Sequence, residues 1–445
     1  MSVLTRRTAL RAGVLGGAVS LNAAPTAHAA TASAATTTAV YDVQTYGAVG
    51  DGKTDDTKAM QAALDAAGAV AGSAVYFPPA SGGCYRTTGL TVPGGVGRLM
   101  GESALFSADG PSIVSLTGSV LAPYDTTATS LLTIGSNGSG TTVTGNPHGL
   151  TVDGLGFRGT LTTGKSVPAL WAATVVDTSD VTFVECRDLY CGSFEYAGYP
   201  ENGDGQGGFV TFRSSGTGNA FSVNGRVLFC SSYGAGTFLL ADGLSQAYPG
   251  GGSTDGRVVC CQVNGHGYGV VLGREFAGAG GWAVLETHFS SEPGQQHITY
   301  GTVGNAWTLR VEGCYLDVCG DVHIDCDSRG LQAVGNYFRG QANPTAVRFG
   351  TGLTQDGRDP AAQIVGNTYD LDGNTAAQDF VRFNGFTAAT FAAHGGGEYR
   401  GNLVHNHGAA MPKTWVAQFA GSDAKSITDT TSTTLDLAQG PVLSA

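Results

Sequence analysis

The chain repeats one short pattern from about residue 180 to residue 370. An apolar run leads to a small or amide residue, a turn follows, and a second β-rich run ends in Gly. Successive copies lie between 22 and 44 residues apart, without helical periodicity, when the small-residue position is aligned on Cys186, Cys230, Cys261, His288, Cys314, Asn336 and Asn367. An irregular β-rich repeat of this length predicts a β-solenoid, in which each coil adds a strand to parallel sheets.

A β-sandwich is the competing architecture for a β-rich chain. It would require strict alternation along each strand and hairpin turns such as Asn-Gly at regular spacing. The sequence does not show that spacing, and a column of Cys and Asn suits stacking in a narrow turn. We therefore predict an all-β fold of stacked parallel strands over residues 40–410.

One helix is expected near the start of this region. Thr54-Asp55-Asp56-Thr57 precedes an apolar stripe with helical spacing, formed by Ala59, Met60, Ala63, Leu64 and Ala67. The end of a solenoid exposes unpaired strands and an open core, so a helix there would act as a cap.

The same region resembles the opening of the pectate-lyase-like superfamily, which includes polygalacturonases, β-1,3-glucanases, alginate epimerases and phage tailspikes. The resemblance covers about residues 40–93 and is carried by Tyr46-Gly47-Ala48-Val49-Gly50-Asp51-Gly52, Thr54-Asp55-Asp56-Thr57 and Val75-Tyr76-Phe77-Pro78-Pro79. It implies a single-stranded right-handed parallel β-helix, and it does not specify the chemistry. On physical grounds we expect Asp51, Asp55 and Asp56 to form turns and cap the helix, not to catalyse a reaction.

The two ends of the chain differ from the repeat. Residues 1–29 resemble a twin-arginine export signal, with Arg6 and Arg7 before a mild apolar run and Ala27-His28-Ala29 as a cleavage pattern. Residues 30–39 are expected to form a linker, and residues 411–445 either a last coil with a cap or a loose tail. We predict a secreted, extracellular protein without a membrane anchor, since no later apolar stretch is long enough to span a bilayer.

The charge balance limits the partners. Without the three arginines of the leader, the chain carries 20 basic and 35 acidic residues, a net charge of −15. Binding to nucleic acid or to an anionic membrane depends on Lys and Arg, so both partners are excluded. A polysaccharide or oligosaccharide is the expected substrate, and the sequence leaves the oligomeric state open.

Nine cysteines admit two interpretations. The Cys-x4-Cys pairs Cys186/Cys191 and Cys314/Cys319 could be metal sites, or the thiols could be buried core residues. We favour buried thiols because the segments are β-like and the spacing differs from that of zinc knuckles. No metal and no cofactor are therefore expected, except calcium if the protein is a lyase.

The strongest candidate site lies on one strand. If Val322, Ile324 and Cys326 face the core, Asp321, His323, Asp325 and Asp327 are left on the other face. Asp325 and Asp327, about 6.6 Å apart along the strand, would suit the acid/base or nucleophile pair of a glycosidase. A calcium-binding or merely solvated acidic strand is the alternative.

Other side chains near this face complete the predicted site. Two further carboxylates, Asp242 and Glu275, are additional catalytic candidates. The predicted substrate-binding residues are His266, Arg274, His297, His323, Arg348 and Arg382. Gly265-His266-Gly267 resembles the histidine motif of polygalacturonases, but the rest of that pattern is missing, and a turn histidine is the commoner explanation of such a motif.

Three functions remain after this reasoning. The first is an exported glycoside hydrolase, or an intramolecular glycosyl transferase, acting on a neutral glycan. The second is a lyase or epimerase acting on uronates, which would need Arg, Lys or calcium to neutralise the substrate carboxylate. The third is a non-catalytic carbohydrate-binding or spike-like module that stacks sugars on exposed aromatic side chains, with Tyr196, Tyr199, Tyr248 and Trp282 as the candidates. The acidic chain, with no Lys between residues 165 and 413, favours the first.

Overall fold

The computed structural model describes residues 38–107, 114–128, 130–135, 149–159, 163, 174–192, 208–214, 222–233, 237–243, 253–264, 268–273, 279–290, 296–301, 308–319, 321–339, 345–350, 361–371, 379–383, 397–405 and 433–434. The predicted export signal, most of the predicted linker and most of residues 411–445 lie outside the described residues.

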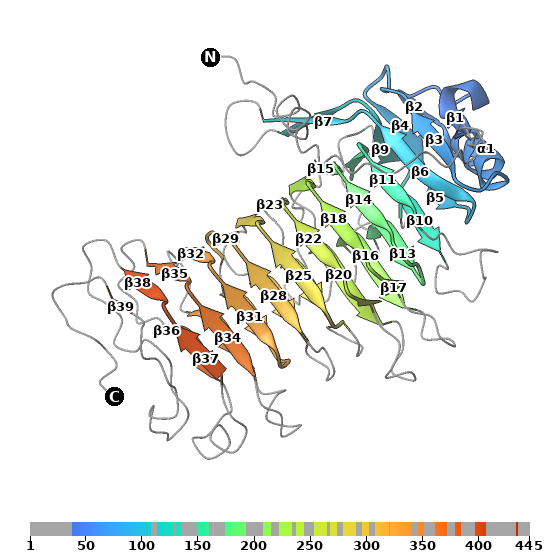
Figure 1. The fold of residues 1–445 in the computed structure, drawn as a ribbon. Coiled ribbons are helices and arrows are strands. Elements are labelled where there is room, and N and C mark those ends of the chain that lie inside the picture. The colour runs from blue at the N-terminus through green and yellow to red at the C-terminus, as the bar shows by residue number, and fades with distance from the viewer. Residues whose placement is uncertain are drawn as a thin grey trace, which may run out of the picture. The chain divides into compact units, whose positions relative to one another are not determined.

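The described chain winds through three parallel sheets, and each coil adds one strand to each of them (Figure 1). The twelve-stranded sheet contains β1 (Val40–Asp42), β3 (Ser73–Phe77), β6 (Val96–Gly101), β11 (Thr151–Asp153), β14 (Glu185–Arg187), β18 (Arg226–Leu228), β22 (Arg257–Val259), β25 (Trp282–Leu285), β28 (Leu309–Glu312), β31 (Leu331–Val334), β34 (Ala362–Val365) and β37 (Gly397–Arg400). The thirteen-stranded sheet contains β2 (Asp51–Asp55), β4 (Cys84–Thr87), β9 (Val120–Pro123), β12 (Gly156–Arg158), β15 (Tyr190–Gly192), β19 (Ser231–Tyr233), β23 (Gln262–Asn264), β26 (His288–Ser290), β29 (Tyr315–Leu316), β32 (Tyr337–Arg339), β35 (Thr368–Asp370), β38 (Leu403–His405) and β39 (Thr433–Thr434). The ten-stranded sheet contains β5 (Leu90–Val92), β10 (Leu132–Gly135), β13 (Thr174–Ser179), β16 (Gly208–Ser214), β20 (Thr237–Gly243), β24 (Tyr268–Leu272), β27 (Gln296–Tyr300), β30 (Val322–Cys326), β33 (Thr345–Phe349) and β36 (Asp379–Phe383).

Two small pairs accompany these sheets. β17 (Ser222–Val223) pairs in parallel with β21 (Ser253–Thr254), and β7 (Ala104–Ser107) pairs antiparallel with β8 (Val114–Thr117). All strand pairs within the three large sheets are parallel. The predicted all-β, right-handed parallel β-helix is thus confirmed.

A single α-helix caps the first coils, as predicted. Helix α1 (Thr57–Gly68) buries Met60, Ala63, Leu64 and Ala67 against the adjoining strands, beside the short 3₁₀ helix η2 (Val43–Tyr46). This apolar face closes the open end of the core, where strands would otherwise lack a neighbour.

The three N-terminal aspartates hold backbone groups, as expected. Asp51 accepts from the amides of Lys53 and Thr54, and Asp55 accepts from the amide of Thr57 at the start of the helix. Asp56 precedes the helix, but its carboxylate accepts from the amides of Val49 and Gly50 in the loop before it. Two of these residues therefore form a turn and a cap, and the third fastens a loop.

A corner column connects the twelve-stranded to the thirteen-stranded sheet. From β14 onward the residue before the corner has a positive φ, and it is non-glycine in four coils (Asp188, Phe229, Cys260 and Glu286) and Gly in the four that follow (Gly313, Gly335, Gly366 and Gly401). The next residue is buried and stacks on its equivalent one coil away, which gives the corner column Leu189, Cys230, Cys261, Thr287, Cys314, Asn336, Asn367 and Asn402. Small side chains suit this column because the backbone turns sharply there.

Two members of the predicted repeat column are wrong. Cys186 lies in the middle of β14 opposite Val227, three residues before the true corner residue Leu189. His288 lies one residue past Thr287, on β26, where its ring is 4.7 Å from that of Tyr315. Both errors come from coils whose corner residue, Leu or Thr, differs from the Cys and Asn of the other coils.

The core is continuous along the stack and contains most of the cysteines. Eight of the nine thiols are buried, Cys260 is partly exposed, and none forms a disulfide. The prediction of buried thiols is confirmed for those eight. Trp282, predicted as an exposed sugar-stacking residue, is buried: its indole donates to the Ser253 carbonyl at 2.8 Å, and its ring packs on Gly256, where a Cβ would lie 2.3 Å from it.

Candidate active site

The outer face of the ten-stranded sheet gathers the charged residues that the sequence singled out. Backbone pairing aligns Thr299, Asp325, Arg348 and Arg382 in one outward column over β27, β30, β33 and β36. Neighbouring members of such a column are about 4.8 Å apart. Further toward the N-terminus the same column holds buried apolar residues, Leu240 and Val271. Polar residues return one coil beyond Leu240, where Thr211 donates to Asp177 at 2.8 Å in the same column, so the charged stretch over β27–β36 is one of two polar parts of this face among the described strands.

Arg348 draws two carboxylates together. Its Nε and Nη2 donate to Asp325 at 2.9 and 2.7 Å, and its Nη1 and Nη2 donate to Asp321 at 3.0 and 2.9 Å. Gln296 joins them, since its Nε2 donates to both carboxylates at 2.8 and 3.2 Å. We call Gln296, Asp321, Asp325 and Arg348 the Asp–Arg cluster.

The electrostatics of the Asp–Arg cluster follow from this geometry. Hydrogen bonds from Arg348 to Asp325 raise the pKa of the guanidinium above its ordinary value, although burial acts in the opposite direction. Bidentate pairs of this kind are stronger and more rigid than ordinary surface ion pairs. With all three groups ionised the cluster carries one net negative charge. The side chains of Asp321, Arg348 and Asp325 are 38%, 24% and 19% exposed, so the cluster remains open to a bound ligand.

The predicted partner of Asp325 is different in the structure. Asp327 follows the end of β30, and its carboxylate lies over Gly350 of the next coil, where a Cβ would meet Asp327 Oδ1 at 1.7 Å. Asp321, which precedes the strand, is the carboxylate that converges with Asp325. Strand alternation placed Asp327 correctly on the outside but could not show that the residue before the strand folds back onto the same arginine.

The two predicted substrate-binding histidines face the interior. His297 and His323 are fully buried, and their ring centroids are 5.0 Å apart. His297 stacks on Phe289, and His323 contacts Phe338, so both rings continue the aromatic stack of the core. Burial lowers the pKa of His323 to about 3 and holds that of His297 well below its ordinary value. The prediction that they bind substrate on the outer face is wrong.

The reason is a corner at the start of each strand of this sheet. The register of β30 and β33 pairs Val322 with Thr345 and Ile324 with Val347, and it skips His323. His323 and Ile324 are consecutive, yet both lie in the interior. Simple alternation between core and solvent therefore fails at this residue.

Of the remaining predicted residues, the structure describes Asp242, which does not join the Asp–Arg cluster. Asp242, at the end of β20, is buried and lies in the register of Asp327, three coils away, or about 14 Å along the stack. Glu275, His266 and Arg274 lie outside the described residues.

The sequence analysis did not identify two polar residues at this site. Gln296 belongs to the Asp–Arg cluster, and Thr299 donates to its side-chain oxygen at 2.8 Å. Both were missed because neither is ionisable.

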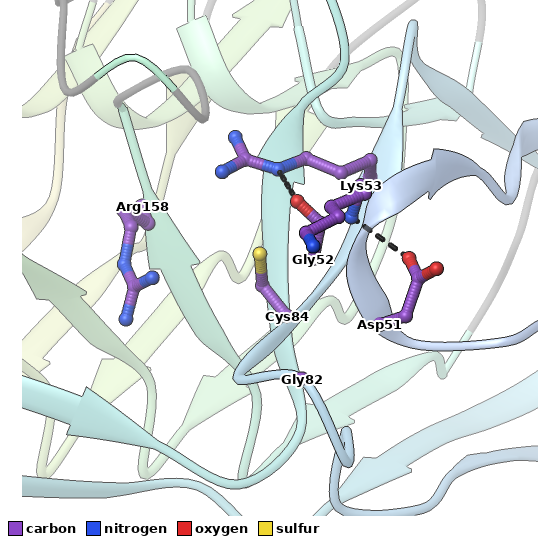
Figure 2. Close-up of a pocket in the computed structure, with 7 residues that line it drawn as sticks. Asp51, Gly52, Lys53, Gly82, Cys84 and Arg158 are labelled. Carbon is purple, nitrogen blue, oxygen red and sulfur yellow. Dashed lines mark hydrogen bonds between the residues drawn. The ribbon is translucent and has the colours of Figure 1, made fainter.

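A recess of about 490 Å³ lies near the N-terminal end, on the thirteen-stranded sheet (Figure 2). It is lined by Asp51, Gly52, Lys53, Gly82, Cys84, Arg86 and Arg158. Arg86 is buried and donates to the carbonyls of Gly52 and Pro123, both at 2.9 Å. These polar groups tie the first coils together, so we regard the recess as part of the scaffold.

Comparison with known proteins supports the fold and leaves the chemistry open. The family described as rhamnogalacturonase A/epimerase, pectate lyase-like, matches residues 40–93, the segment that forms the cap and the first coils. The predicted resemblance to the pectate-lyase-like β-helix superfamily is confirmed over this segment. Among the residues described for this β-helix, no helix is both long and apolar enough to cross a membrane.

Relatives of this β-helix protein include two enzymes of Azotobacter vinelandii. Mannuronan C5-epimerase AlgE1 is 41% identical over 95 residues, which are 19% of this chain and 6% of the epimerase. Alginate lyase 7 is 44% identical over 78 residues, 16% of this chain and 9% of the lyase. The matches thus span a small part of the relatives' own length.

A solved structure shares the fold over most of the chain. PfbA, a surface adhesin of Streptococcus pneumoniae, superimposes with a TM-score of 0.55 at 14% identity, covering 83% of this chain and 86% of PfbA. At that identity the similarity establishes the β-helix and not the chemistry.

Proposed function

We propose that this protein is an exported carbohydrate-active enzyme that binds an extended polysaccharide along the outer face of the ten-stranded sheet. The observation that carries the proposal is the convergence of Asp321 and Asp325 on Arg348 at an accessible strand face. The reaction is cleavage or rearrangement of a glycosidic bond at the Asp–Arg cluster. Relatives that act on mannuronan or alginate, as their names state, support a polysaccharide substrate.

The two carboxylates take different roles. One oxygen of each is bonded to Arg348 Nη2, so these oxygens are no farther apart than the sum of the two bonds. Glycosidases that retain configuration place their carboxylates about 5 Å apart. Asp325, the less exposed, is the nucleophile that stabilises positive charge at the anomeric carbon. Asp321, the more exposed, protonates the leaving oxygen as Asp325 attacks the anomeric carbon, and it then deprotonates the water that hydrolyses the glycosyl-enzyme bond and frees Asp325, while Arg348 holds both carboxylates in position.

A uronate lyase or epimerase is the second candidate. Its support is the identity of the sequence relatives, and Arg382 adds a cation one coil beyond Arg348. In that reaction an arginine neutralises the substrate carboxylate before a base removes the C5 proton. Calcium would belong to this candidate and not to the hydrolase.

One assay set separates these reactions. Purified protein is incubated with neutral glycans and with alginate and polygalacturonate, with and without calcium. Reducing ends without ultraviolet absorbance support hydrolysis, absorbance of unsaturated products supports a lyase, and a changed uronate composition by NMR supports an epimerase. Loss of polymer without any of these signals supports an intramolecular transferase. No change with any glycan would contradict an enzyme and favour a binding module.

A matched variant tests the site independently of the substrate. Asp317 forms an ion pair of 3.2 Å with Arg339, away from the cluster, and its side chain is as exposed as that of Asp325. Asp325→Asn should lower turnover on the order of 10³-fold, and Asp317→Asn should leave it unchanged. Equal activity of the two variants would move the centre away from the Asp–Arg cluster.

A further inference from the structure

A third side chain completes a buried group beneath the outer face. Cys319 Sγ lies 3.7 Å from His323 Nδ1, which lies 3.1 Å from His297 Nδ1. All three residues have no exposed surface, and their potential ligand atoms lie within 4.8 Å of one another. Donors on one metal ion, with metal–nitrogen bonds of about 2.0 Å and metal–sulfur bonds of about 2.3 Å, are about 3.3–3.8 Å apart. The two separations from His323 Nδ1, 3.7 Å to Cys319 Sγ and 3.1 Å to His297 Nδ1, are close to that range.

In the metal-free group, two neighbours approach a single ring nitrogen, Nδ1 of His323. The backbone of Arg339 hydrogen-bonds the His323 ring in the sense that favours a ring N–H. Because Nδ1 faces His297 and Cys319, this N–H falls on Nε2, and Nδ1 keeps a single lone pair. His297 Nδ1 and Cys319 Sγ both approach that one lone pair, at 3.1 and 3.7 Å.

The other nitrogen of His297 gives independent support. Nε2 is buried and has no hydrogen-bond partner among the described residues. With its proton on Nδ1, His297 would bury a bare lone pair there, and unpaired buried polar atoms are rare. With a metal on Nδ1, the proton moves to Nε2. The Val318 backbone acts on the His297 ring in the sense of an acceptor, which is the polarity that a ring N–H requires, but it forms no hydrogen bond with Nε2.

We propose that His297, Cys319 and His323 bind one thiophilic transition-metal ion, with copper(I) as the preferred occupant. A thiolate and two imidazoles are ligands that copper and zinc share. Among the described residues, no carboxylate belongs to this group. One thiolate and two neutral imidazoles make a monovalent ion electrically neutral, whereas Zn²⁺ would leave a net positive charge in a core where charge is costly.

The ion in this proposal has a structural role. Its presence would contradict the expectation from the sequence that the chain holds no metal. His297 belongs to β27, His323 belongs to β30, and Cys319 lies in the connection before β30. The ion therefore joins two consecutive coils directly beneath the Asp–Arg cluster. Because the group is fully buried, the ion enters while the chain folds.

The test uses refolding. The full chain is unfolded in guanidinium with a chelator and a reductant, then refolded with copper(I), with Zn²⁺ or without metal, and desalted. We expect one copper per chain and a higher melting temperature than that of the metal-free protein. Cys319→Ser should retain no copper. Cys314→Ser, which changes a buried thiol of the same coil, should retain one equivalent.

Several results would overturn the proposal. Absence of bound metal in the refolded parent would reject the site, and so would equal copper retention by Cys319→Ser. Stoichiometric zinc in preference to copper would reject the charge argument that selects copper(I). If Cys319→Ser does not fold, alkylation of the parent in mild denaturant replaces it. Copper should then protect Cys319 and not Cys314, and equal labelling of both would reject the site.

Discussion

Replacing Asn367 in the corner column should destabilise the later coils by a predictable amount. Its Oδ1 accepts from the backbone amide of Asn336 at 2.9 Å and from the Asn336 side chain at 3.0 Å. Its Nδ2 donates to the Ala333 carbonyl and to Asn402 Oδ1, both at 2.9 Å. All three asparagines are at most 2% exposed, so water does not replace these bonds.

The magnitude follows from the groups left unpaired. Asn367→Ala removes the acceptor of the Asn336 amide, and a buried donor without a partner costs about 1–3 kcal/mol. Loss of the two Nδ2 bonds adds about 1 kcal/mol each. We therefore expect Asn367→Ala to lower the free energy of unfolding by about 4 kcal/mol.

Asn367→Thr is the matched control. Thr287 occupies the same corner three coils earlier, where its hydroxyl accepts from the Cys261 amide at 3.4 Å and donates to the Leu285 carbonyl at 3.0 Å. A threonine at 367 should therefore restore an acceptor for the Asn336 amide and lose about 2 kcal/mol instead of about 4.

Guanidinium unfolding followed by far-ultraviolet circular dichroism measures the difference. Coils of a solenoid can unfold separately, so the midpoints of the same transition should be compared, in the order Ala below Thr below parent. A midpoint for Asn367→Ala equal to that of the parent, or above that of Asn367→Thr, would refute the account of the corner column.

Three further outcomes are expected. Asp325→Asn should lower turnover on the order of 10³-fold while the melting temperature stays near that of the parent. Asp317→Asn should change neither turnover nor melting temperature. A large loss of melting temperature in Asp325→Asn would indicate a structural role instead. Gly256→Ala should cost about 1–3 kcal/mol because its Cβ meets the Trp282 ring, and an unchanged denaturation midpoint would contradict this packing. A thiol reagent under native conditions should modify Cys260 at most among the nine cysteines, and mass spectrometry that finds several labelled thiols would contradict the burial described above.

The fold was predictable from the sequence because two independent signals agree. The Cys and Asn positions repeat once per coil, and the segment around Asp51 and Asp56 matches a known family. The errors at Cys186 and His288 have one cause: the corner residues of their coils are Leu189 and Thr287 in place of Cys or Asn, and the preceding Asp188 and Glu286 do not signal the left-handed backbone as Gly does.

The candidate site was predictable only in part. Alternation placed Asp325 on the outer face, and the repeat aligned Arg348 and Arg382 beside it. Alternation could not show that His323 lies in the interior, because the strand turns a corner at that residue. A one-coil spacing of 26 residues between His297 and His323 was the available signal that the two rings stack.

The corner column also determines what kind of change the stack tolerates during evolution. One coil returns to the corner after 22 residues, between Cys314 and Asn336, and another after 35, between Asn367 and Asn402. In both coils the backbone amide of the earlier corner residue donates to the Asn side chain of the next corner, so the segment between the two corners can lengthen while the next coil starts in register. An insertion in one coil therefore stays local, and new loops can be acquired one at a time without refolding the coils that follow.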